Sequence, residues 1–153
     1  KDFRKCVTIA ELLQLAGYRT MMVGKWQGRD LAVDRGFDRF FGPMCQAKIS
    51  YFHEVEQNPY RLDRDHWDVP EDFYLTDAIN DFAAQFLEEA VRHEQPFFLY
   101  VAHIAPHWPL HAREADIAPY RQQYRETGCW HTISESARCQ YIRPACRYLL
   151  CPG

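Results

Sequence analysis

The sequence lacks several features that would assign a protein to a class at once. No apolar run approaches the roughly 20 residues that a membrane-spanning helix needs, and the start has no signal-peptide pattern. The net charge is −3, so no broad attraction to nucleic acid or anionic lipid is expected. Glycine-rich phosphate loops, G-x-S-x-G elbows and H-E-x-x-H helices are absent. We therefore expect neither a nucleic-acid partner nor a membrane partner.

The cysteines exclude a further kind of site. No two of the six have the C-x-x-C spacing of a zinc site or a thioredoxin-like motif. Two stand alone and four crowd the end of the chain: Cys6, Cys45, Cys129, Cys139, Cys146 and Cys151. Helical and strand periodicity also fade from about Thr127. Two interpretations of residues 127–153 stay open, a disulfide-stapled subdomain and translation in a wrong reading frame, and we favour the second.

The remaining residues carry the pattern of a folded α/β domain. Thr8 and Glu11 have the spacing of a capping box, which predicts a helix start. Gly17 suits the left-handed residue that ends a helix, and residues 18–23 then read as a short strand that Gly24 breaks. The predicted apolar face of this helix consists of Ile9, Leu12, Leu13 and Ala16.

A second helix and strand follow the same plan. Thr76 is predicted to cap a helix that runs to about His93. Its apolar stripe comprises Ile79, Phe82, Ala83, Phe86, Leu87 and Ala90. The continuous apolar run 97–102 predicts a strand covered on both faces, as is typical of a parallel sheet. Two helix–strand units in succession predict an α/β layered domain.

The connection between the two units is expected to be rich in loops. Residues 36–75 have little periodicity and contain several glycines and prolines. Such a long segment fits a functional loop region or plain irregular packing equally well. At its start, residues 35–42 are predicted to form a turn with a buried aromatic cluster.

Lys25 is the first candidate for chemistry. It follows the first predicted strand directly, and ligands of open α/β sheets bind at the carboxyl edge of the strands. A lysine in that place can hold an anionic group as a point charge. The competing interpretation is an ordinary solvated loop lysine.

His107 is the second candidate, because its segment follows the second predicted strand. Pro106 and Pro109 stiffen the backbone around it, which suits a side chain that must be held in place. A histidine can donate a proton to a leaving oxygen or bind an anion when it is protonated. The competing interpretation is that His107 and His111 pack among aromatic side chains as ordinary loop residues.

Four strings in this order resemble the arylsulfatase family of the alkaline phosphatase-like superfamily. They are TIAELLQLAGYRTMMVGKW, DRGFDRFFG, FYLTDAI and PFFLYVAHIAPHWPLHA, and the similarity spans about residues 6–125. The resemblance implies a mixed sheet with helices on both faces, so residues 1–126 are expected to be part of a sulfatase domain. It also implies hydrolysis of sulfate esters, with a small molecule or a sulfated glycan as substrate. A complete protein of this family is expected in the periplasm or outside the cell.

The resemblance also implies roles for individual residues. Lys25 matches the lysine of the family's G-K-W-H motif, which contacts the sulfate, and His107 matches a histidine that meets the leaving-group oxygen. The family nucleophile is a formylglycine made from a cysteine or serine, and a bound calcium steadies the sulfate. Both the formylglycine motif and the paired aspartates that bind the metal are missing here, so the calcium ligands are expected outside this chain. Cys139 and Arg143 have part of the motif spacing, which we interpret as coincidence.

Gln27 is the main departure from the family pattern within the matched strings. It stands where the family has histidine, and as a substrate-binding residue it can donate a hydrogen bond but cannot carry positive charge. We therefore predict that this chain alone is an inactive fragment of a sulfuric ester hydrolase. Three alternatives stay open: a phosphatase or phosphodiesterase of the same superfamily, a non-catalytic module that binds sulfated ligands, and a gene remnant without function.

Overall fold

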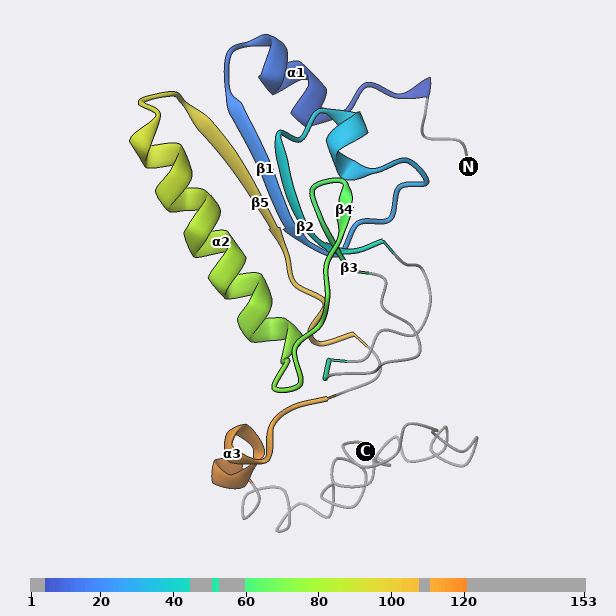
Figure 1. Ribbon diagram of the computed structural model, residues 1–153, viewed down its shortest axis with the longest axis vertical. Helices are drawn as coiled ribbons and strands as arrows, with labels where there is room; N and C mark the ends of the chain where they lie inside the picture. The colour runs from blue at the N-terminus through green and yellow to red at the C-terminus, as the bar shows by residue number, and fades with distance from the viewer. Residues whose placement is uncertain (1–4, 45–50, 53–59, 108–110, 121–153) are drawn as a thin grey trace, which may run out of the picture. The chain divides into compact units, whose positions relative to one another are not determined.

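The computed structural model describes residues 5–44, 51–52, 60–107 and 111–120. The chain divides into two compact units, Lys1–Ile104 and Ala105–Gly153, and the first contains the sheet. Its strands are β1 (Arg19–Gly24), β2 (Arg39–Pro43), β3 (Tyr60–Leu62), β4 (Asp65–His66) and β5 (Phe97–Ala102). In the described residues they form one sheet in the order β4-β3-β2-β1-β5 (Figure 1). Strand β1 runs parallel to β2 and β5, and β3 and β4 are antiparallel, so the sheet is mixed as expected.

Helices cover both faces of this sheet, which confirms the predicted fold class. Strand β1 is buried, and its alternate side chains enter different clusters: Met21 and Val23 on one face, Met22 on the other. Helix α2 (Leu75–Arg92) packs on the first face. Helix α1 (Ile9–Leu15) and the 3-10 helix η2 (Ala32–Arg35) pack on the second (Figure 1).

Helix α1 begins as predicted but buries a different face. The Glu11 N–H donates to the Thr8 hydroxyl over 3.0 Å, the Thr8 N–H donates to the Glu11 carboxylate over 2.7 Å, and Gly17 is left-handed at φ +84°. The predicted apolar face is wrong, because Ile9, Leu12 and Ala16 are exposed and Ala10 is buried instead. A side chain added at Gly36 would lie 2.4 Å from the Glu11 nitrogen. Because the backbone at Gly36 passes so close to α1, only a helix face with a small side chain such as Ala10 fits against it. The large side chains of the helix therefore point outward.

Helix α2 follows its prediction with two corrections. It begins after Tyr74, not at Thr76, and no side chain caps it; the Leu75 N–H donates instead to the Tyr51 carbonyl over 2.8 Å. Most of the predicted stripe is buried or partly buried, but Leu87 is 40% exposed. The stripe is therefore narrower than the sequence suggested.

Strand β5 pairs in parallel with β1 over all six residues, as the apolar run indicated. The prediction that both faces are covered is wrong for the described residues. Phe97, Tyr100 and Val101 are exposed by 40%, 49% and 39%. In the described residues β5 is also the last strand of the sheet, with β1 as its neighbour on one side.

The segment predicted to be loop-rich contributes β2, β3 and β4, which the sequence analysis missed. These strands are short, and β3 and β4 form a hairpin whose turn places Asp63, not a glycine, at a positive φ of 56°. The buried aromatic cluster is confirmed by Phe37, Phe40 and Phe41, and the Phe41 ring stacks on Phe82 with ring centroids 3.8 Å apart.

The second unit supplies only short helices among its described residues. They are α3 (Glu114–Ile117) and the 3-10 helix η3 (Ala118–Tyr120). The boundary at residue 126 and the tail 127–153 lie outside the described residues, so both stay predictions. Across the part of the chain that the structure describes, no helix combines the length and the apolar character that crossing a membrane requires.

Candidate active-site edge of the sheet

Glycines bring the carboxyl ends of the three parallel strands together. Gly24, the last residue of β1, has φ +101°, and a Cβ there would lie 2.1 Å from the Ala102 carbonyl oxygen of β5. A Cβ on Gly42 of β2 would lie 2.0 Å from the carbonyl oxygen of Gly24. No side chain fits in either gap, so the three strand ends meet backbone against backbone.

Lys25 leaves the sheet at this point, as predicted. Its N–H donates to the Ala102 carbonyl over 2.9 Å, which extends the pairing of β1 with β5 by one residue. The residue is half-buried. Within the described residues no ion pair involves its ammonium group. A cation in this position is available to an anionic ligand at the carboxyl edge.

Trp26 holds the loop that follows Lys25. Its indole N–H donates to the Asp30 carbonyl over 2.7 Å, and its ring packs edge-to-face on Phe37 with centroids 6.0 Å apart. A Cβ on Gly28 would lie 2.5 Å from the indole, so the backbone passes directly over the ring. Sequence reasoning missed this anchor, although a tryptophan followed two residues later by glycine was a signal for it.

Gln27 is exposed and lies beyond the end of β1. The argument that placed it beside Lys25 assumed an extended chain, in which side chains alternate. Residues 25–28 have no regular strand structure. The orientation of Gln27 toward a shared cleft therefore stays a prediction.

His107 belongs to the second unit and is exposed there. It follows Pro106, whose peptide bond to Ala105 is cis. His111 is partly buried, and both histidines interact with neighbouring groups. Because Lys25 and His107 belong to different units, their predicted convergence on one anion stays a prediction.

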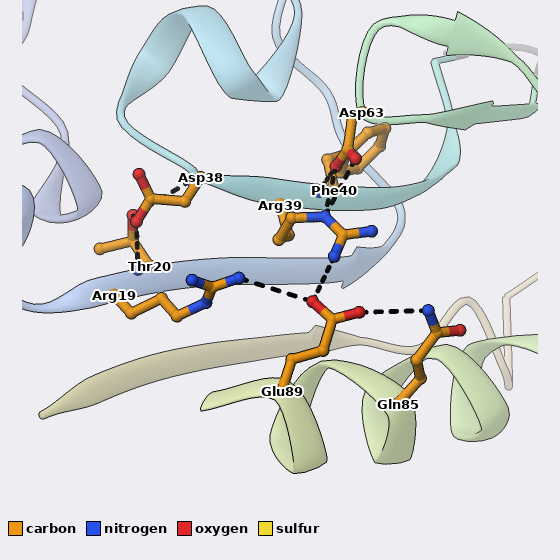
Figure 2. A network of polar contacts seen from close by, with 8 residues as sticks. All are labelled: Arg19, Thr20, Asp38, Arg39, Phe40, Asp63, Gln85 and Glu89. Carbon is orange, nitrogen blue, oxygen red and sulfur yellow. Dashed lines mark hydrogen bonds and ion pairs between the residues drawn. The ribbon is translucent and has the colours of Figure 1, made fainter. Parts of the chain in front are cut away.

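The amino ends of the same strands carry a network of charges (Figure 2). Arg39, the first residue of β2, pairs with Glu89 of α2 and with Asp63 of the β3–β4 turn. Arg19, the first residue of β1, lies 3.5 Å from the same Glu89 carboxylate. Burial raises the pKa of Glu89, but hydrogen bonds from Arg39 and Gln85 outweigh burial and leave the pKa below its ordinary value. This network ties α2 to the sheet at the edge opposite Lys25.

No described group of three or more histidine, cysteine, aspartate or glutamate side chains could hold a metal ion. The described residues therefore include no ligand set for the calcium that the family resemblance implies. No residue here is assigned to it.

The chain belongs to the sulfatase family, because the Sulfatase family model matches residues 1–144. It is 32% identical over 136 residues to an arylsulfatase of Klebsiella aerogenes, a match that covers 80% of this chain and 28% of that protein. It is 34% identical over 128 residues to arylsulfatase J of Mus musculus, which covers 74% of this chain and 21% of that protein.

Solved structures agree with this assignment. The structure of Ps i-CgsB in complex with k-i-k-neocarrahexaose matches with a TM-score of 0.67 and 28% identity, over 84% of this chain and 33% of that one. A second structure, of a protein in complex with its substrate D-glucosamine-2-N,6-O-disulfate, matches with a TM-score of 0.56 and 28% identity, over 75% and 22% of the two chains. The 153 residues thus span between about a fifth and a third of these relatives.

Proposed function

We propose that these residues are part of an enzyme that hydrolyses sulfate esters, and that its active site includes Lys25 at the carboxyl edge of the sheet. The observation that carries the proposal is the half-buried lysine at the carboxyl ends of three parallel strands, without an ion-pair partner among the described residues. Its ammonium group binds the sulfate and stabilises the negative charge that develops on it. The curated relatives reported above are named arylsulfatases, and nothing observed favours a phosphatase.

His107 supplies the second role in this proposal. Its ring meets the ester oxygen and donates a proton as that oxygen leaves. The segment that carries it comes shortly after β5, in the second unit, so the proposal requires the complete protein to bring it to Lys25. The nucleophile and the calcium ligands come from residues outside this chain, and the 153 residues alone are expected to turn over no aryl sulfate.

The proposed substrate class is based on Lys25 and Gln27, at and beyond the carboxyl end of β1. A sulfate ester presents one anionic group to Lys25, whereas Gln27 offers an uncharged amide where the resemblance implies histidine. We assign a small sulfate ester or a sulfated glycan as substrate. One solved relative holds a disulfated glucosamine as its substrate, which supports the second of these.

The test is a chimera of the Klebsiella aerogenes arylsulfatase in which these residues replace the matching segment. With 4-nitrophenyl sulfate, we expect turnover by the chimera and none by the 153-residue chain. Lys25→Ala should lower turnover by roughly 100-fold or more, while Lys5→Ala, at an exposed lysine, should change it little. A chimera that melts like its parent but is inactive would contradict the proposal, and so would turnover that is indifferent to Lys25.

A further inference from the structure

The loop that follows β1 carries a second cation besides Lys25. Arg29 is exposed and lies four residues after Lys25, in the segment between β1 and η2. Within the described residues, no ion pair or side-chain hydrogen bond involves its guanidinium group. Two cations without an ion-pair partner in the described part of the chain therefore lie on one short loop at the carboxyl edge of the sheet.

The two acidic residues that follow in the chain interact with other cations. The Asp34 carboxylate pairs with Arg64 over 2.6 Å. The pKa of Arg35 is raised chiefly by its hydrogen bond with Glu11, and the negative charge of Asp30 contributes to the same shift. Among the described residues, neither Asp30 nor Asp34 forms an ion pair with a cation of the loop. The loop therefore keeps two positive charges that an anionic ligand can pair with.

Trp26 fixes the shape of this loop. Its indole N–H donates to the Asp30 carbonyl over 2.7 Å, which closes the chain over four residues. The backbone at Gly28 passes over the indole, where an added Cβ would lie 2.5 Å from the ring. Four residues of fully extended chain span at most about 14 Å, and a closed loop spans less. The backbone that carries Arg29 is therefore held close to the backbone that carries Lys25.

We propose that Arg29 is a specificity-determining residue that binds a second anionic group of the sulfate ester. Lys25 binds the sulfate that is cleaved, and the planar guanidinium group of Arg29 binds a second sulfate or a carboxylate through two parallel hydrogen bonds. The short separation of the two backbone positions favours a second group on the same ring of the substrate or on a neighbouring ring. The inference rests on the proposed function, which supplies the role of Lys25, and it narrows the substrate class to esters with two anionic groups.

The first test measures substrate preference in the chimera described above. 4-Nitrophenyl sulfate has one anionic group, whereas 2-carboxy-4-nitrophenyl sulfate and 4-nitrocatechol disulfate have a carboxylate and a sulfate as the second. Arg29→Ala should lower the ratio of kcat/KM for a dianionic substrate to kcat/KM for 4-nitrophenyl sulfate by about 10-fold, and Arg29→Lys should lower it less. Arg92→Ala, at an exposed arginine at the end of α2, is the matched control. A ratio that Arg29→Ala leaves unchanged for both dianionic substrates would overturn the proposal.

A second measurement does not depend on turnover. Benzenesulfonate and benzene-1,3-disulfonate, which are not esters and cannot be hydrolysed as such, are titrated into the 153-residue chain and into the chimera by calorimetry. We expect the disulfonate to bind about 10-fold more tightly, Arg29→Ala to remove this difference, and Lys25→Ala to weaken the binding of both ligands. Equal affinities that depend on Lys25 would overturn this inference and leave the proposed function intact. Binding of neither ligand, or binding that Lys25→Ala does not change, would contradict both.

Discussion

The two ends of the parallel strands are held together in different ways. At the amino ends, Arg19 and Arg39 share the Glu89 carboxylate, and Arg39 also pairs with Asp63 (Figure 2). At the carboxyl ends, Gly24 and its neighbours meet through backbone atoms alone. The lysine that follows Gly24 has no ion pair in the described part of the chain.

If the proposed function holds, this difference separates stability from ligand binding along one set of strands. Charged side chains that pair with one another stabilise the amino ends and are occupied by those partners. Glycines bring the carboxyl ends together without using a charged side chain, and Lys25 makes no ion pair among the described residues. Substitutions at the two ends should therefore differ in kind as well as in size.

The largest effect is expected for Gly24→Val. The added side chain would collide with the Ala102 carbonyl and would have to adopt φ +101°, so β1 and β5 must separate. We expect the free energy of unfolding to fall by at least ~3 kcal/mol, measured by urea denaturation.

Gly17→Ala is the control for this prediction. Gly17 also has a positive φ, +84°, but nothing lies within 4 Å of the added carbon. It should cost about 1 kcal/mol, the strain of the left-handed backbone alone. If the two substitutions cost the same, close backbone approach is not what holds the carboxyl ends.

Arg39→Ala should have the next largest effect, at the opposite end. It leaves Glu89 and Asp63 without their shared partner and removes the guanidinium that lies 4.5 Å from the centre of the Phe86 ring. We expect a loss of about 2 kcal/mol in the free energy of unfolding. Arg64→Ala, which breaks an exposed pair with Asp34, should cost under about 1 kcal/mol. Equal losses would show that the network contributes no more than a surface ion pair.

The network also predicts a dependence on pH. The pKa of Glu89 is lower in the folded protein than its ordinary value of 4.5, so the ionised carboxylate stabilises the fold above that value. This contribution is lost as pH falls through the folded pKa. Glu89→Gln should therefore destabilise the protein at pH 7 by roughly 1–2 kcal/mol and by much less near pH 3. Glu88→Gln, at an exposed neighbour, is the control, and a Glu89 effect that persists at pH 3 would contradict this account.

The smallest effect is expected for Lys25→Ala. Because Lys25 makes no ion pair within the described residues, its removal should change the free energy of unfolding by less than about 0.5 kcal/mol. The same substitution should abolish most turnover in the chimera. A loss of stability comparable to that of Arg39→Ala would make Lys25 a structural residue instead.

The sequence predicted elements wherever a local signal was strong. The Thr8–Glu11 capping box and the apolar run 97–102 identified a helix start and a strand, because both depend on residues close in sequence. Which face of α1 is buried could not be predicted, since the close approach of Gly36 to Glu11 comes from a segment about 25 residues away. The same holds for β2, which is defined by its pairing with β1 and β3.

The candidate site was predicted only in part. The position of Lys25 at the carboxyl edge was predicted correctly because it follows a recognisable strand, and its role there stays a prediction. The anchor that Trp26 provides depends on contacts with Asp30 and Phe37, which no local pattern reveals. The charge network was missed for the same reason, because Arg39 and Glu89 are far apart in sequence.

The most direct measurement is a crystal structure of the complete protein, or of the active chimera, with sulfate bound. The account predicts a sulfate at the carboxyl ends of β1 and β5, with one oxygen roughly 3 Å from the Lys25 ammonium and the His107 ring within hydrogen-bond reach of the same ion. A sulfate bound elsewhere, or a His107 ring on the other side of the sheet from Lys25, would contradict it.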